Sequence, residues 1–590
     1  MLSFSSLGSG DDYTGDLPNN FLPVALPVIQ GSLGRGTFVF YSGKNDGAIT
    51  ATGLLDRDLL KTLRENTQTA GGPERLFSFL GPRVATVKEQ SLKPASRGPE
   101  ALISGGADRP AADIGVIDTG IAFWNPSFGA DLPAFYGMSF LSLEGEDPVL
   151  ELGEVGIADI VQLSRDHGDA AVHRKLAHDY KESIWAGYNG QSLLTPDSFG
   201  HGTAIAALAG EYGGEGTRLF GLELPVIAVT DASGDVLQGV LAMAIRRLVH
   251  MMDPREKGDR RIVIVIPFAF LGGPHGQSNL IADQFSKAVA ALSAQLSIEI
   301  IVPMGNHAED QAHAIAILGQ EERDTLQLRL MPDDHSSSTV ELVFGAKTEG
   351  VTLVSPLGDE ATTELANGVQ TLRRGAEVIG AMWTRDIGNG FRRARLCFAP
   401  TAGSDEITCE AGLWTLNFTG EGEVKAWILR DDFQLRGAGL LPRRQARFED
   451  PHYPQFKPHD IYEPAQDHDL STVRRDGSGS VLASSAIYAG QADASTDKPQ
   501  PSIKAVAAEW AVAKESDMGG PAPYSGRLHG VSSSAVVVDT PRPGAGHLAV
   551  ANGTQRKFRV SGTSAAAAIK AGEEASFKEG ALDPVFADII

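Results

Sequence analysis

Strands alternate with helical segments in the middle of the chain, and this alternation limits the fold more than any other feature. The residue pattern predicts strands at 225–230, 262–270 and 298–302, with helices at 236–251 and 279–296 between them. Strand, helix and strand in this order form a parallel sheet with right-handed crossovers. We therefore predict an α/β domain built on a parallel sheet.

A second pattern begins after about residue 320 of this 590-residue chain. Short alternating strands are separated by Gly, Pro and Asp turns, and no helical spacing occurs among them. Seven such strands are predicted, at 325–331, 339–344, 351–355, 377–384, 391–398, 413–418 and 424–430. They predict an inserted all-β domain of the sandwich type. A chain of this length is expected to hold two or three structural units.

The domain boundaries follow from these two patterns. The all-β domain spans 320–445 and interrupts the α/β domain, whose first part spans 106–319 and whose second part spans 471–590. Several prolines among charged residues indicate an extended connector at 446–470.

Residues 1–105 form an N-terminal extension. A strand is predicted at 36–41, and Asp56 is a candidate cap for a following helix. The extension is interpreted either as an extra layer on the α/β domain or as a unit resembling a pro-segment.

Charge and cysteine content exclude several classes of partner. The net charge of −23, without a cluster of Lys and Arg, argues against binding to a nucleic-acid backbone. Cys397 and Cys409 are too few for a disulfide framework, and free thiols are favoured over a bond between them. No Cys/His array suggests zinc, and no acidic loop has a convincing calcium spacing, so we predict no cofactor.

The first 20 residues are acidic, and the longest apolar run, 262–271, has ten residues. A signal peptide needs a positive segment, and a membrane helix needs about 20 apolar residues. We therefore predict a cytoplasmic protein without a membrane span.

Ser564 is the candidate nucleophile. It lies in Val-Ser-Gly-Thr-Ser-Ala-Ala-Ala-Ala, residues 560–568, a pattern that fits a serine at the start of a buried helix. Such a helix start presents unpaired N–H groups and positive partial charge to a developing oxyanion. An ordinary Ser/Thr turn before an alanine-rich helix fits this stretch too, so its interpretation depends on residues elsewhere.

Two further segments supply candidate partners. Asp118 ends an apolar strand and precedes Thr-Gly, where parallel sheets place their sites. Aspartic proteases need two Asp-Thr-Gly loops, and the sequence has no second one. His201 lies between two glycines before a helix of small residues. A lone histidine is more often structural, but a histidine at a helix start between two glycines is better placed to turn its ring into a cleft.

Asn306 follows Gly305 at the end of the strand predicted at 298–302. Its amide N–H can point toward a developing oxyanion. A turn asparagine is the alternative, and on local sequence alone it is the commoner case.

Asp118, His201 and Ser564 follow one another in the chain order of subtilisin. Val-Ile-Asp-Thr-Gly, Gly-His-Gly-Thr-Ala, Gly-Asn and Ser-Gly-Thr-Ser-Ala-Ala-Ala resemble the four sequence blocks of subtilases, the subtilisin-like serine proteases. The resemblance covers roughly residues 110–310 and 470–575. Sedolisins share Ser-Gly-Thr-Ser but use Glu and Asp in place of the histidine.

The resemblance implies a parallel-sheet subtilisin-like catalytic domain and a serine endopeptidase. Ser564 would attack the peptide carbonyl, His201 would act as base and then acid, and Asp118 would orient the imidazole. Asn306 and the backbone N–H of Ser564 would hold the oxyanion.

By the same resemblance, Phe270, Leu271 and Gly272 bind the substrate backbone, as does Gly305. Phe270 stands where subtilases usually have a polar residue, and Ala568 stands where they usually have proline.

The expected partner is a protein or peptide substrate, with neither nucleic acid nor membrane. The alternative is a catalytically silent or partner-activated subtilase-like protein whose inserted β domain binds a regulatory protein. A hydrolase of esters or lipids is disfavoured because Ser564 lacks a Gly-x-Ser-x-Gly motif.

Overall fold

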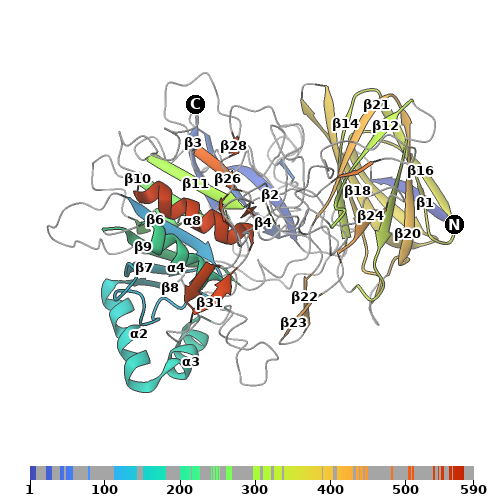
Figure 1. Cartoon of the computed structure of the whole chain (residues 1–590). Helices are drawn as coiled ribbons and strands as arrows, with labels where there is room; N and C mark the ends of the chain where they lie inside the picture. Colours follow the sequence, from blue (N-terminus) through green and yellow to red (C-terminus); the bar gives the residue numbers. More distant parts are fainter. Residues whose placement is uncertain are drawn as a thin grey trace, which may run out of the picture.

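Figure 1 shows a computed structural model of the chain, which is rich in strands and has few helices. It describes residues 1–7, 112–141, 150–180, 200–225 without 214–215, most of 241–252, 261–268, 297–303, 305, most of 310–449 and 562–576. Short strands between 21 and 79 and between 480 and 560 are described as well.

One eight-stranded sheet forms the α/β part of the molecule, in the order β28-β26-β11-β10-β6-β9-β7-β8. All neighbouring strands are parallel except β7 and β8. The bounds are β6 Asp113–Asp118, β7 Phe135–Phe140, β8 Leu150–Gly153, β9 Arg218–Glu223, β10 Arg261–Val265, β11 Ser297–Pro303, β26 Ser502–Val506 and β28 Val536–Val538. Every residue of β6 is buried, as expected for a central strand covered on both faces.

The strand order changes direction at β6. From β6 the chain continues to β7 and β9 on one side, and then crosses to β10 and β11 on the other. Ligands of parallel sheets bind outside the carboxyl ends of the strands at such a reversal. Asp118 is the last residue of β6 and therefore lies at this point.

Helices α4 (His201–Gly213) and α8 (Thr563–Ser576) lie side by side on the sheet (Figure 1). Their backbones approach closely, because a Cβ atom added at Gly572 would lie 2.5 Å from the carbonyl oxygen of Ala209. Helix α4 packs on β6, and α8 packs on β10 and β11. The predicted small-residue helices therefore start near the same edge of the sheet.

Helices α2 (Glu154–His167) and α3 (Asp169–Asp179) pack on each other, and α2 also packs on β7 and β8. They bury Ile157, Ile160 and Val172 in the same core as the alanines of α8. This core joins residues that lie more than 400 positions apart in the sequence.

The all-β part consists of two facing sheets. The larger has the order β1-β17-β18-β19-β14-β21-β12-β25, and the smaller β16-β15-β20-β13-β24. The bounds are β1 Leu2–Leu7, β12 His313–Leu318, β13 Thr325–Leu330, β14 Ser338–Gly345, β15 Thr348–Val354, β16 Glu360–Glu364, β17 Gly368–Arg374, β18 Glu377–Gly388, β19 Phe391–Phe398, β20 Gly412–Gly420, β21 Gly422–Ile428, β24 Arg447–Glu449 and β25 Ser480–Leu482.

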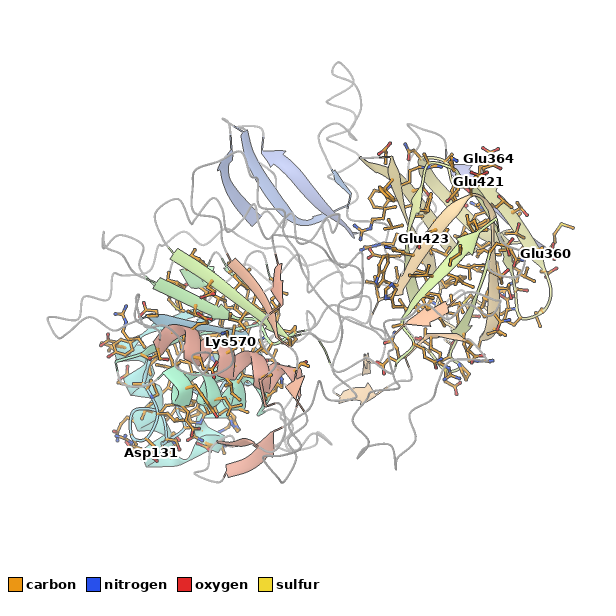
Figure 2. The ribbon with its side chains drawn as sticks, turned by 45° about the horizontal axis from the view of Figure 1, so that its top comes forward. Asp131, Glu360, Glu364, Glu421, Glu423 and Lys570 are labelled. Atoms are coloured by element: carbon orange, nitrogen blue, oxygen red, sulfur yellow. The ribbon has the colours of Figure 1, made fainter. Side chains whose placement is uncertain are left out.

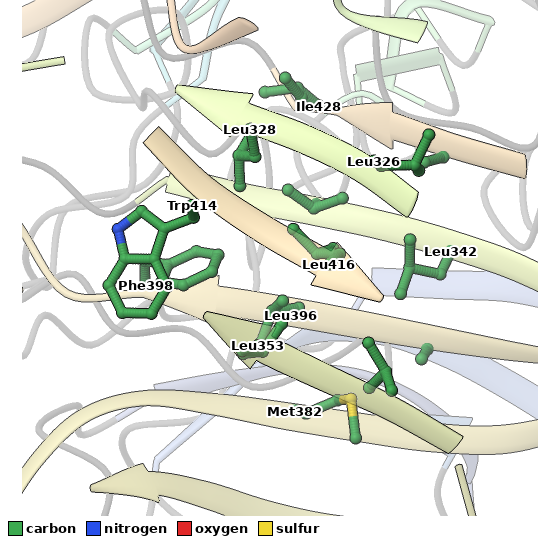
Figure 3. Close-up of a cluster of buried hydrophobic side chains, with 14 of the residues drawn as sticks. Leu326, Leu328, Leu342, Leu353, Met382, Leu396, Phe398, Trp414, Leu416 and Ile428 are labelled. Carbon is green, nitrogen blue, oxygen red and sulfur yellow. The ribbon is translucent and has the colours of Figure 1, made fainter. Parts of the chain in front are cut away.

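Apolar side chains of both sheets meet between them (Figure 3). Trp414 and Leu416 of β20 face Phe398 and Leu396 of β19, and the rings of Phe398 and Trp414 are 5.1 Å apart. This core is separate from the core of the α/β part. Figure 2 shows the same division, with Lys570 in one group of side chains and Glu360 and Glu423 in the other.

The sandwich contains strands from outside the predicted range 320–445. Strand β1, at the start of the predicted N-terminal extension, pairs antiparallel with β17. Leu2 is buried in the sandwich core and Phe4 packs against it, as expected for strand residues two positions apart on one face of a sheet. Strands β24 and β25 lie in the predicted connector and in the predicted second part of the α/β domain, respectively.

All seven strands predicted between 325 and 430 overlap observed strands, as does the strand predicted at 298–302. The strand predicted at 262–270 begins one residue earlier, as β10, and ends at Val265. Described residues between 241 and 251 are helical, as predicted, whereas 279–296 lies outside the described residues.

Of the strand predicted at 225–230, the structure describes only Pro225. Strand β9 ends at Glu223, and Pro225 lies after it outside any strand. Residues 226–230 lie outside the described part. The prediction overlooked the apolar run Leu-Phe-Gly-Leu before Glu223.

The strand predicted at 36–41 overlaps β3 (Phe40–Asn45). This strand belongs to a four-stranded sheet with β4 (Ala48–Asp56), β2 (Phe21–Val28) and β5 (Ser78–Phe79). The helix predicted after Asp56 lies outside the described residues.

Three further strand pairs are β22 (Phe433–Arg436) with β23 (Gly439–Pro442), β27 (Ala508–Glu509) with β29 (Arg542–Pro543), and β30 (His547–Val550) with β31 (Lys557–Val560).

Cys397 and Cys409 are buried free thiols, which confirms the predicted redox state. In the part of the chain that the structure describes, no helix combines the length and the apolar character needed to cross a bilayer.

The close contact between α4 and α8 predicts an unusual response to alanine. Gly572→Ala improves intrinsic helix propensity, yet its Cβ would overlap backbone atoms of α4. We expect a net loss of about 1–2 kcal/mol in the free energy of unfolding, because overpacking outweighs a propensity gain of about 1 kcal/mol. Urea denaturation followed by tryptophan fluorescence measures the change.

Gly156→Ala in α2 is the control, because its Cβ would meet only the flexible side chain of Leu152, at 3.1 Å. It should leave stability unchanged or raise it slightly. Equal effects of the two substitutions would contradict the role assigned to the helix contact.

Candidate active site

The structure brings together two of the predicted catalytic residues. The Nδ1 atom of His201 lies 2.8 Å from Oδ2 of Asp118. The Asp118 side chain is fully buried, whereas 45% of the His201 side chain is exposed. A carboxylate in this position holds the proton on Nδ1, so Nε2 is left to accept a proton.

The turn after Asp118 is fastened to the first turn of α4. The hydroxyl of Thr203 donates to the carbonyl of Gly120 and accepts the N–H of Ala122, each at 2.8 Å. The N–H of Gly202 donates to the carbonyl of Thr119 at 3.1 Å. A Cβ atom at position 202 would lie 2.5 Å from that carbonyl oxygen, so the contact requires glycine. The Gly and Thr after His201 therefore hold the Asp118 turn against the histidine.

A second acidic residue contacts this turn and was missed in the sequence. Glu223 ends β9 directly beside Asp118 in the register of β6 and β9. Its Oε1 atom accepts the N–H of Gly120 at 2.8 Å, and Oε2 accepts the N–H of Ile121 at 3.1 Å. The strand predicted at 225–230 begins after Glu223, so this residue was not recognised as the end of a strand. A carboxyl group ending an apolar run next to Pro225 was the available signal.

The buried position of Glu223 alters its acidity. Burial raises the pKa of its carboxyl group to about 8, and the negative charge of Asp118 acts in the same direction. The two amide hydrogen bonds oppose this rise, because they favour the carboxylate.

Ser564 is the second residue of α8. Its hydroxyl donates to the carbonyl of Pro267 at 2.9 Å, in the segment that follows β10. The next residue, Phe268, has its ring centroid 6.4 Å from that of His201. The segment after β10 therefore contacts both the serine and the histidine. A hydroxyl has a single proton, so this proton has to leave Pro267 before it can pass to an imidazole.

Gly305 joins the segment after β11 to the start of α8. Its N–H donates to the hydroxyl of Thr563 at 3.0 Å. Asn306, the predicted oxyanion donor, follows directly, but it lies outside the described residues. Phe270, Leu271 and Gly272 of the predicted substrate-binding segment also lie outside them.

The described residues contain no group of three or more His, Cys, Asp and Glu side chains that could hold a metal ion.

No family model matches the chain, and no curated protein matches it either. Among solved structures, the chain is similar to the Clostridium perfringens CspB protease, with a TM-score of 0.49 and 15% sequence identity. The match covers 79% of this chain and 81% of that one. The assignment of a function therefore depends on the residues of the site.

The hydroxyl of Thr203 should be needed for stability. Thr203→Val keeps the shape of the side chain but leaves the buried N–H of Ala122 and carbonyl of Gly120 without this partner. We expect the free energy of unfolding to fall by about 1–3 kcal/mol. Chemical denaturation measures the loss.

Thr203→Ser is the control, because it keeps the hydroxyl and removes only a methyl group. If Ser and Val were equally destabilising, the loss would come from packing and the hydrogen bonds would not explain it.

Proposed function

We propose that the protein is a subtilisin-like serine endopeptidase, which hydrolyses peptide bonds through an acyl-enzyme. The observation that carries the proposal is the 2.8 Å contact between Asp118 and His201 beside the helix that begins with Thr563 and Ser564. The chain order Asp, His, Ser and the parallel sheet support it.

The reaction would begin at Ser564. A serine hydroxyl is a weak nucleophile at neutral pH until a base takes its proton. His201 would accept this proton through Nε2 and later give it to the leaving amine. Asp118 would stabilise the imidazolium that forms in between, and its burial strengthens this interaction.

The oxyanion of the tetrahedral intermediate would lie near the start of α8. The backbone N–H of Ser564 and the side-chain amide of Asn306 are the proposed donors. The hydrogen bond between Gly305 and Thr563 supports this assignment, because it holds the residue before Asn306 against α8.

The substrate class is a protein or peptide, bound through residues 270–272. We propose no cofactor, and the cytoplasmic location remains a prediction from the sequence. The inserted β-sandwich is the proposed surface for a regulatory protein.

Activation by a partner is a second candidate, favoured by the hydrogen bond from Ser564 to the carbonyl of Pro267. In this arrangement the nucleophile is turned away from proton transfer to the histidine. An enzyme of this kind would react slowly with an active-site probe until a partner or substrate displaced Pro267.

A fluorophosphonate probe tests the proposed nucleophile. We expect the parent protein to be labelled, and Ser564→Ala to lose labelling and to lower peptide kcat by on the order of 10⁶-fold. Mass spectrometry should locate the adduct on Ser564.

Ser576→Ala is the matched control, because this serine lies at the other end of α8 and its hydroxyl donates to the carbonyl of Glu573. It should label normally. Labelling of Ser564→Ala at the parent rate would rule out the proposed nucleophile. Slow labelling of the parent, accelerated by a bound protein, would favour the partner-activated form.

Asn306→Ala tests the proposed oxyanion donor. Loss of a donor that acts in the transition state should lower kcat by about 10²–10³ and leave KM nearly unchanged. Steady-state kinetics with a chromogenic peptide separates the two parameters. A change confined to KM would place Asn306 in substrate binding instead.

A further inference from the structure

We propose that Glu223 is a positioning residue whose carboxylate holds the Asp118 turn in its active arrangement, and that proton uptake by this carboxyl group turns the site off. The inference rests on the proposed endopeptidase function and adds a pH-dependent control to it.

The geometry of Glu223 fits the ionised form. Both carboxylate oxygens accept backbone N–H groups, one from Gly120 and one from Ile121. A protonated carboxyl group has one oxygen that donates. That oxygen loses its negative charge and becomes a weaker acceptor for the amide N–H that it faces. Proton uptake therefore weakens at least one of the two contacts that Glu223 makes with the turn.

The contacts of the turn make this loss relevant to the triad. Asp118 lies two residues before Gly120, the first residue that Glu223 holds, and the N–H of Leu224 donates to the carbonyl of Asp118 at 2.8 Å. The end of β9 thus contacts both Asp118 and the turn that follows it. A change at Glu223 is transmitted to the contact between Asp118 and His201.

Proton uptake is accessible near neutral pH. Burial raises the pKa of Glu223 to about 8, with a smaller contribution in the same direction from the charge of Asp118. An exposed glutamate would stay ionised over the working range of most enzymes. In this position the carboxyl group takes up a proton as the pH falls through about 8.

Few other ionisable groups face Glu223 among the described residues. Strand β6 places Asp118 beside it, and α4 contributes His201 through its contact with Asp118. The other ionisable residues of α4, Glu211 and Tyr212, lie in its last turn.

The remaining neighbours are neutral at this end of the sheet. Strand β7 places Phe140 beside Glu223, and its one ionisable residue, Tyr136, lies toward the other end. At the start of β9, Arg218 forms an ion pair with Asp113, away from Glu223. Asp118 is therefore the charge that couples most directly to Glu223.

The ionised state would favour catalysis in two ways. It holds the turn that carries Asp118, and it adds a negative charge near an imidazole that becomes positive in the transition state. Both effects disappear when Glu223 takes a proton. The activity should therefore rise with the ionisation of Glu223, whose pKa is about 8.

Glu223→Gln tests the inference, because the amide imitates the protonated acid, with one acceptor and one donor. We expect the ratio of parent to variant kcat/KM to lie near one at pH 6.5 and to reach about 10–100 at pH 9.5. A chromogenic peptide and the rate of fluorophosphonate labelling provide two readouts.

Glu299→Gln is the matched control, because Glu299 is a buried glutamate in β11 of the same sheet. Its ratio should stay constant with pH. A constant ratio for Glu223→Gln in an active enzyme would overturn this inference and leave the proposed function standing. Absence of labelling in the parent at every pH would overturn both.

Melting temperatures give a readout that does not require activity. The folded protein keeps the Glu223 proton at pH values where the unfolded chain, with a pKa near 4.5, has released it. The parent should therefore lose stability as pH rises from about 4.5 to 8, a loss that Glu223→Gln avoids. We expect the variant's melting temperature to rise relative to the parent over this interval and then to level off. A difference independent of pH would contradict the switch.

Discussion

The contact between helices α4 and α8 is the constraint on which the candidate site depends. Each helix carries one predicted catalytic residue in its first turn, His201 or Ser564, and the two backbones approach so closely that position 572 has no room for a Cβ atom. Small residues remove the bulk that normally separates packed helices. The start of α8 is thereby set against the sheet edge at which Asp118 lies.

Much of this arrangement could be predicted because it is encoded in local patterns. Apolar alternation located seven of the sandwich strands, and glycine and alanine next to His201 and Ser564 indicated tightly packed helices. The structure places Asp118 and His201, two residues singled out in the sequence, in contact with each other. Their catalytic roles and that of Asn306 stay predictions.

Other features depend on partners distant in sequence. Strand β1 pairs with β17 across more than 360 positions, and no local pattern specifies such a partner. Glu223 was missed because its importance comes from the register of β9 against β6. The hydrogen bond from Ser564 to Pro267 likewise depends on how the segment after β10 returns to α8. Tertiary register, rather than propensity, decides each of these cases.

The pairing of β1 with β17 makes the chain between them a closed loop. The sheet strands β6 to β11 and helix α4 all belong to this loop, whose two ends are fastened by one set of backbone hydrogen bonds. The entropic cost of closing a loop grows only with the logarithm of its length. A loop this long therefore costs the sandwich little more stability than a shorter one. A single cut between β1 and the α/β strands would therefore leave β1 attached as a non-covalent strand. The α/β part is thus joined to the sandwich at both ends of the loop, through β1 at one end and through the chain that leads to β17 at the other.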